Sequence, residues 1–193
     1  MASSIIGIMG LKRSGKDTFA DRLVSHHGFT RLALADPMRE FALALDPLIA
    51  TDWQDHYLVR LSFIVDTIGW ERAKGIGEVR RTLQRLGTEA GRGILGEDLW
   101  VHKTLALAAA MSGPVVVTDV RFDNERAAID AHGVVVRVTR PGLTADTWHS
   151  SERLATDFSV PAYAEIVNEG TVDDLHTLAD FLAEDLREWL LTD

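Results

Sequence analysis

The sequence predicts an α/β protein in which a parallel sheet of about five strands lies between layers of helices, giving three layers. Two observations support this fold class. Short apolar runs alternate along the chain with stretches whose apolar residues recur at helical spacing. One of the runs, Val115–Thr118, is β-branched at every position, which is typical of a central strand buried on both faces.

The expected elements follow one another in a regular order. Strands are expected at residues 4–9, 31–35, 115–118, 134–139 and 165–167. Helices are expected at residues 16–27, 36–45, 99–111, 123–131 and 171–191, the first of them stopped by Gly28. Asp36 is expected to be the N-cap of its helix, with Pro37 at the first helical position. Residues 46–97 are the least regular part, because glycines interrupt their helical patterns.

Composition and charge exclude several classes of protein. A chain of 193 residues with 46% hydrophobic and 25% charged residues predicts one globular domain. The absence of cysteine excludes disulfides and thiolate chemistry, and no apolar run approaches the roughly 20 residues of a membrane span. A net charge of −9 argues against binding to a nucleic acid polymer, although residues 71–92 form a basic island suited to a compact anion. We therefore expect a cytoplasmic protein that acts on small molecules, with no membrane partner.

A glycine-rich loop is the strongest local signal. The pattern Gly10-x-x-x-x-Gly15-Lys16 lies between an expected strand and an expected helix, where a phosphate-binding loop is found. Glycines let successive backbone N–H groups converge on phosphate oxygens, and the helix adds the positive end of its dipole. The residues predicted to bind a nucleotide cofactor here are Gly10, Lys12, Arg13, Ser14, Gly15, Lys16, Asp17 and Thr18.

A magnesium site is predicted beside this loop. Asp17 follows the loop lysine, where Ser or Thr is usual, and Thr18 comes next. Either Asp17 contacts the metal, directly or through water, or Thr18 does so and Asp17 favours the helix start. Asp119, directly after the β-branched strand, is the expected second carboxylate, and its alternative role is to cap a turn.

Arginines supply the candidate acceptor site. Arg121 follows the Asp119 strand and is a candidate catalytic residue, whereas Arg126 could equally pair with neighbouring acids. Asp36 and Arg39 follow the second strand, so they are candidates for the acceptor, with helix capping as the alternative for Asp36. Further substrate-binding candidates are Gln84, Arg85 and Arg92.

The segment from Arg140 to Pro161 predicts a mobile excursion, because it is rich in Pro, Gly, Ser and Thr. It contains His149-Ser-Ser-Glu152-Arg153. A Ser/His/acid hydrolase is a weak interpretation of this run, since the residues are adjacent and no nucleophile elbow accompanies them.

Several blocks, taken together, resemble a known family. They are Gly10–Thr18, Ala35–Arg39, Gln84–Arg92, Thr118–Glu125, His149–Glu152 and Val167–Gly170, in that order. The chain resembles, over nearly its whole length, the deoxynucleoside monophosphate kinases of bacteriophages, within the P-loop nucleoside monophosphate kinase group. Two blocks distinguish this family from other P-loop proteins better than the glycine loop does. They contain Arg-Leu-Gly-Thr-Glu and Asp-Val-Arg-Phe-Asp-Asn-Glu.

The resemblance implies ATP- and Mg²⁺-dependent phosphorylation of a deoxynucleoside monophosphate to the diphosphate. It implies one kinase domain over residues 1–193, with an acceptor-binding insert at 46–97 and a lid near 140–160. Arg140 and Arg153 would belong to the lid, Glu152 would bind substrate, and Asn168 and Gly170 would border the donor base. A homodimer is compatible with it, and a phage-encoded protein would work in the host cytoplasm.

Two alternatives stay open at this point. Phosphomevalonate kinases resemble the chain in the aspartate after the loop lysine and in a related Ser-Glu element. A P-loop ATPase that acts as a switch would hydrolyse ATP without a small-molecule acceptor.

Overall fold

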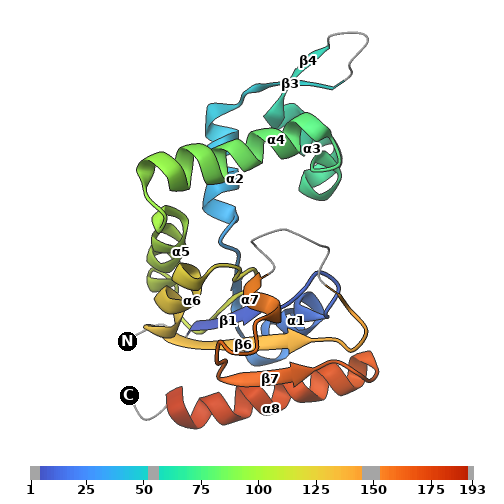
Figure 1. Ribbon diagram of the computed structural model, residues 1–193, viewed down its shortest axis with the longest axis vertical. Coiled ribbons are helices and arrows are strands. Elements are labelled where there is room, and N and C mark those ends of the chain that lie inside the picture. Colours follow the sequence, from blue (N-terminus) through green and yellow to red (C-terminus); the bar gives the residue numbers. More distant parts are fainter. Residues whose placement is uncertain (1–4, 52–56, 145–152, 191–193) are drawn as a thin grey trace. The chain divides into compact units, whose positions relative to one another are not determined.

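The computed structural model describes residues 5–51, 57–144 and 153–190 (Figure 1). The chain divides into two compact units, which we describe separately. The sheet unit consists of residues 1–34 and 104–193, and the helical unit consists of residues 35–103.

The sheet unit contains the predicted parallel sheet. Its strands are β1 (Ile5–Met9), β2 (Thr30–Leu32), β5 (Val115–Val117), β6 (Gly133–Thr139) and β7 (Ala164–Val167). Their order is β2-β5-β1-β6-β7, and every neighbouring pair is parallel. The α/β fold class with about five parallel strands is therefore confirmed. The carboxyl ends of these strands all lie at one edge, so the loops that follow β1, β5 and β6 are brought together there.

Helices cover the two faces of this sheet. On one face α1 (Lys16–His27) and α8 (Val172–Leu190) pack on alternate strand residues, in an apolar core that includes Ile8, Phe19 and Val136. On the other face lies α6 (Asp123–Asp130), where a side chain at Gly7 would come within 3.0 Å of Ile129. The short α7 (Arg153–Thr156) follows β6 in the chain.

An ion-pair cluster joins α1 to α8. Arg22 donates to both carboxylate oxygens of Asp180 at 2.8 Å, and His27 Nε2 lies 2.7 Å from the same carboxylate. These contacts hold the pKa of Asp180 well below its usual range, chiefly through the Arg22 hydrogen bonds and then through His27. These contacts therefore hold the C-terminal half of α1 against α8.

The helical unit has its own apolar core. It contains α2 (Asp36–Leu45), the antiparallel strands β3 (Leu48–Ala50) and β4 (Leu58–Arg60), α3 (Leu61–Ala73), α4 (Gly77–Gln84), the π-helix η1 (Arg85–Leu95) and the start of α5 (Leu99–Ala109). Its fully buried side chains include Ile49, Leu61 and Val79. No helix in the described ranges has both the length and the apolar character that a membrane span requires.

Two details differ from the sequence-based expectation. Helix α2 begins at Asp36 and its N-cap is Ala35, so Asp36 lies in the first turn, where its carboxylate still favours the helix dipole. The glycines of η1 do not interrupt it, and two of them are packing positions. A side chain at Gly87 would meet Met38 at 2.6 Å, and one at Gly91 would meet Trp100 at 2.6 Å.

Candidate nucleotide-phosphate site

The loop from Gly10 to Gly15 connects β1 directly to α1. It turns tightly, with the Ser14 N–H donating to the Leu11 carbonyl at 3.1 Å. Gly15 has φ of 100°, and a side chain there would come within 2.4 Å of Asn168 Nδ2. A side chain at Gly10 would lie 2.4 Å from the Val138 carbonyl oxygen. Both motif glycines are therefore required by the backbone geometry.

Asn168 holds this loop from the end of β7. Its side-chain amide donates to the Ser14 carbonyl at 2.9 Å, and its backbone N–H donates to the Thr139 carbonyl at 2.8 Å. The side chain is buried. The resemblance assigned Asn168 to the border of the donor base, and the structure gives it a contact with the phosphate loop itself. Gly170, two residues later, is exposed beside Asp174.

The loop presents groups that fit the phosphates of a nucleotide. Ser14 is 1% exposed, and its hydroxyl has no hydrogen-bond partner among the described residues. Lys16 opens α1, and its ammonium lies 3.4 Å from the Leu11 carbonyl. Lys12 and Arg13 are exposed on the loop, and Arg13 has φ of 69°. An unpartnered hydroxyl, a lysine and a helix N-terminus within one turn match the needs of a phosphate group.

Asp119 lies at the same edge of the sheet. The pairing of Gly7 with Val117 places Asp119 level with Met9, one residue before the loop, and the Val120 N–H donates to the Ile8 carbonyl at 3.2 Å. The Asp119 carboxylate accepts the Leu34 N–H at 2.6 Å. The strand-end position predicted for this carboxylate is therefore the observed one, and part of its hydrogen-bonding capacity is used by Leu34, which follows β2.

Two of the predicted magnesium ligands, Asp17 and Thr18, lie in the first turn of α1. Asp17 is 63% exposed, and its carboxylate pairs with Arg31 at 2.7 Å. Thr18 is half-buried in the first turn of α1. Within residues 5–51, 57–144 and 153–190, no three His, Asp or Glu side chains come together as a metal site would need. Carboxylate and hydroxyl oxygens are nevertheless the donor types that Mg²⁺ accepts, usually along with water and substrate phosphates.

The two arginines that follow Asp119 lie in different surroundings. Arg121 is exposed, and the described residues offer its guanidinium no ion pair. Arg126 pairs with Asp130 one helical turn later, as the alternative interpretation anticipated. Glu125 is buried and accepts the N–H groups of Arg121 and Phe122 at 2.9 and 3.1 Å, which fixes the turn that carries Arg121.

The candidate acceptor residues of the helical unit lie on α2, α4 and η1. Arg39 pairs with Asp36 at 3.1 Å, and its guanidinium lies 5.9 Å from the Trp70 ring centroid. Gln84 is exposed at the end of α4, and Arg85 is 76% exposed with Glu89 3.6 Å away. Arg92 is half-buried on η1. A shallow cavity of about 350 Å³ is lined by Arg85, Glu89 and Ile94, among others.

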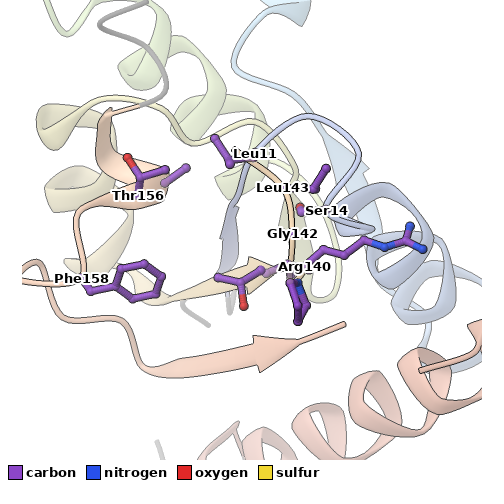
Figure 2. A pocket seen from close by; sticks show the side chains of 11 residues that line it. Leu11, Ser14, Arg140, Gly142, Leu143, Thr156 and Phe158 are labelled. Atoms are coloured by element: carbon purple, nitrogen blue, oxygen red, sulfur yellow. The ribbon is translucent and has the colours of Figure 1, made fainter. Parts of the chain in front are cut away.

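A second cavity, of about 280 Å³, adjoins the phosphate loop (Figure 2). Leu11 and Ser14 line it from the loop, Arg140 from the end of β6, Thr156 from the end of α7, and Phe158 from the segment after α7. Of the other lid candidates, Glu152 and the side chain of Arg153 lie outside the described residues, as does the run from His149.

Sequence reasoning missed Arg137. It stands alone among valines in β6, and its side chain is completely buried. A single arginine in a run of β-branched residues was the available signal, because a strand buried on both faces has no solvent in which to place a charge.

Comparison with known proteins bears on the fold and on the resemblance. No family model matches the chain. A protein of Acanthamoeba polyphaga mimivirus with the name "Putative deoxynucleotide monophosphate kinase" is 29% identical over 187 residues, which is 90% of this chain and 92% of the relative. The solved dephospho-CoA kinase of Campylobacter jejuni superposes with a TM-score of 0.50 at 14% identity, covering 96% of this chain and 98% of the other. The chain therefore shares its α/β fold with this kinase, and the expected resemblance is confirmed by similarity along most of its length to a relative named as a putative deoxynucleotide monophosphate kinase.

Proposed function

We propose that this protein transfers the γ-phosphoryl group of ATP to a deoxynucleoside monophosphate, giving the diphosphate and ADP. The observation that carries the proposal is the phosphate loop: both glycines are sterically required, and Lys16 and an unpartnered Ser14 hydroxyl lie at the start of a helix. The similarity to the mimivirus relative over 90% of the chain supports the choice of acceptor class.

On the donor side, the loop residues bind and orient the phosphates. Lys16 and the backbone N–H groups from Gly10 to Thr18 neutralise the negative charge of the β- and γ-phosphates. A magnesium ion, when bound, would supply further neutralisation of the phosphate charge. Asp119 and either Asp17 or Thr18 are the residues that would hold it, directly or through water. Asp17 would first have to share or release Arg31, with which it pairs here.

On the acceptor side, arginines hold a phosphate in line for attack. Arg121 is assigned a catalytic role, because its guanidinium is exposed on a turn that Glu125 fixes. Arg39, Arg85 and Arg92 are assigned to the acceptor phosphate, and Asp36 and Gln84 to the rest of the nucleotide. Since the acceptor atom belongs to a phosphate that is already ionised, positioning and charge neutralisation suffice, and no strong general base is needed.

The lid candidates complete the proposal. Arg140 and Arg153 would exclude water and add positive charge when the segment near 140–160 covers the phosphates, which would suppress ATP hydrolysis. Glu152 would contact the acceptor.

An acceptor panel tests the proposal. Release of ADP from Mg²⁺-ATP would be measured with each deoxynucleoside monophosphate, each ribonucleoside monophosphate and phosphomevalonate offered separately. The Lys16→Ala variant is expected to lose at least about 100-fold in turnover, because the phosphate charge is left unneutralised. The matched control is Lys103→Ala, which removes an exposed lysine of α5.

Each outcome of the panel has a distinct meaning. Turnover with one or more deoxynucleotides, and little without an acceptor, supports the proposal and defines its base range. Turnover with phosphomevalonate alone would show that the acceptor is not a deoxynucleotide. ADP release at the same rate with and without every acceptor would indicate an ATPase that acts as a switch. A Lys16→Ala variant with full activity would overturn the role of the phosphate loop.

A further inference from the structure

Arg137 is the largest of the fully buried side chains in the described part of the protein, and it carries a charge. Removing a guanidinium from water costs several kcal/mol unless its donors are satisfied. Such a residue persists in a strand of valines only where its partners offset that cost. The contacts of Arg137 therefore indicate what the residue holds in place.

Those contacts converge on the backbone that follows α7. The Nη2 group of Arg137 donates to the carbonyls of Asp157 and Val160 at 2.9 and 2.8 Å, and lies 3.5 Å from that of Leu154. Its Nη1 group donates to the carboxylate of Glu165 on the neighbouring strand. One planar guanidinium thus binds two carbonyls of residues 154–160 through Nη2 and the Glu165 carboxylate through Nη1, an arrangement that a lysine could not reproduce with the same geometry.

The same guanidinium orients Phe158. It lies 5.0 Å from the centroid of the Phe158 ring, within the range of a cation–π contact. Phe158 is 67% exposed, and it lines the cavity of about 280 Å³ together with Thr156. Figure 2 shows Thr156 and Phe158 on one side of this cavity and Leu11 and Ser14 of the phosphate loop on the other.

The opposite wall of the cavity contains a buried polar group without a partner. The Ser14 hydroxyl is in the phosphate loop, is 1% exposed and has no hydrogen-bond partner among the described residues. Buried hydroxyls are nearly always hydrogen-bonded, so this one is expected to be satisfied by a ligand or a water that enters the cavity.

We propose that Arg137 is a positioning residue for nucleotide binding: it fixes residues 154–160 as a preformed wall, so that Phe158 contacts the nucleotide whose phosphates the loop holds. The identity of the ligand rests on the proposed function. The wall itself rests on the hydrogen bonds of Arg137, whose acceptors are all groups of the protein. A preformed wall lowers the entropic cost of binding, because these residues need not be ordered when the nucleotide arrives.

The test compares four variants of the full chain. Arg137→Met keeps the volume and removes the hydrogen bonds, Arg137→Lys keeps the charge, and Phe158→Leu removes the ring but leaves the hydrogen bonds of Arg137 in place. The control, Arg22→Met, breaks the ion pair with Asp180 between α1 and α8 and so gives a destabilised protein with an intact wall. Each variant is studied well below its unfolding midpoint.

Two readouts separate positioning from a merely structural role. The first is amide hydrogen exchange of residues 154–160, and the second is the Kd for Mg²⁺-ATP by calorimetry, supplemented by KM and kcat. Arg137→Met is expected to speed exchange in the segment and to weaken binding about tenfold or more, mainly through KM. Arg137→Lys should fall between it and the unchanged protein. Phe158→Leu should weaken binding by about fivefold with unchanged exchange, and Arg22→Met should bind within twofold of the unchanged protein.

The outcomes are distinguishable from those of the kinase assay. Faster exchange in Arg137→Met with unchanged Kd and KM would overturn the inference and leave the proposed function standing. Unchanged binding by Phe158→Leu would overturn it as well, even if Arg137→Met cannot be folded. The protein could also bind ATP in a way that depends on Arg137 and Phe158 and yet phosphorylate no acceptor. That result would support the inference and contradict the proposed function. A chain that binds no ATP at all would overturn both.

Discussion

The sheet unit and the helical unit use glycine for opposite purposes. In the sheet unit, Gly15 adopts a left-handed conformation that shapes the phosphate loop, and its missing side chain leaves room for Asn168. In the helical unit, Gly87 and Gly91 lie inside a helix, where their missing side chains leave room for Met38 and Trp100.

The difference explains why one unit was easier to predict. A glycine that sets backbone conformation belongs to a short motif with fixed spacing, so it is recognisable in the sequence. A glycine that allows close packing depends on a residue distant in the chain, and in the sequence it reads as a helix breaker. The glycine substitutions below test this contrast, and all predictions follow in decreasing order of their expected effect on folding stability.

Gly15→Ala should have the largest effect. The substitution forces alanine into the left-handed region and places a side-chain atom 2.4 Å from Asn168, so we expect a loss of about 2–5 kcal/mol in unfolding free energy. Phosphoryl transfer should fall by at least about 100-fold, because the loop amides no longer converge. Denaturant unfolding and the acceptor assay measure the two effects.

Gly28→Ala is the matched control for that substitution. Gly28 has φ of 72° at the end of α1, but nothing lies within 4 Å of the added side chain. It should cost only about 1–2 kcal/mol and leave activity unchanged. If the two substitutions were equally harmful to activity, the argument that Gly15 acts through the loop would fail.

Gly91→Ala should destabilise the helical unit by about 1–3 kcal/mol, since the new methyl group would meet Trp100 at 2.6 Å and the Leu86 carbonyl at 2.8 Å. Gly93→Ala, two residues later, meets only the Thr88 carbonyl, at 3.4 Å, and should stabilise the protein by about 0.5–1 kcal/mol. Thermal unfolding of both variants measures the difference. Stabilisation by both would show that Gly91 is not a packing position.

Asp180→Asn should cost about 1 kcal/mol near neutral pH and should change the acid stability profile. The lowered pKa of Asp180 means that the folded state favours its charged form. The stability that it contributes is present above its unfolded pKa of about 3.9 and is lost as the pH falls through the lower folded value. The difference between variant and unchanged protein should therefore shrink below about pH 4.

Denaturant unfolding at several pH values checks this prediction. Glu184→Gln, at an exposed position of the same helix, serves as the control for removing a carboxylate from α8. A constant gap between Asp180→Asn and the unchanged protein down to pH 2 would contradict the assigned role of the Arg22 and His27 contacts.

Arg121→Ala should have the smallest effect on stability, within about 0.5 kcal/mol, because the side chain is exposed and unpaired in the described structure. Its activity should nevertheless fall by about 10–100-fold, through the loss of charge neutralisation at the transferred group. Arg126→Ala, which breaks the pair with Asp130, should show the reverse pattern of lower stability and retained activity. Equal activity in the two variants would remove Arg121 from the site.

The sequence was sufficient for the features that repeat or that form local motifs. The five strands of the parallel sheet, α1 and α8 were readable from apolar spacing, and the loop between β1 and α1 was readable from Gly10, Gly15 and Lys16. The β3–β4 pair and the continuous η1 were not, because short strands and packed glycines depend on tertiary contacts.

The candidate site divides in the same way. The placement of Asp119 at the strand end followed from the alternation of strands and helices. Three features depend on contacts between residues distant in the sequence: the burial of Arg137, the pairing of Asp17 with Arg31, and the hydrogen bond from Asn168 to the loop. No local pattern encodes such contacts, and the roles of individual arginines stay predictions for the same reason.

The most direct test of the central claim is transfer of the labelled γ-phosphoryl group of ATP to a deoxynucleoside monophosphate. The label should appear in the deoxynucleoside diphosphate, in amounts equal to the ADP formed, and Lys16→Ala should abolish it. Label released only as inorganic phosphate, with every acceptor recovered unchanged, would contradict the proposed kinase activity.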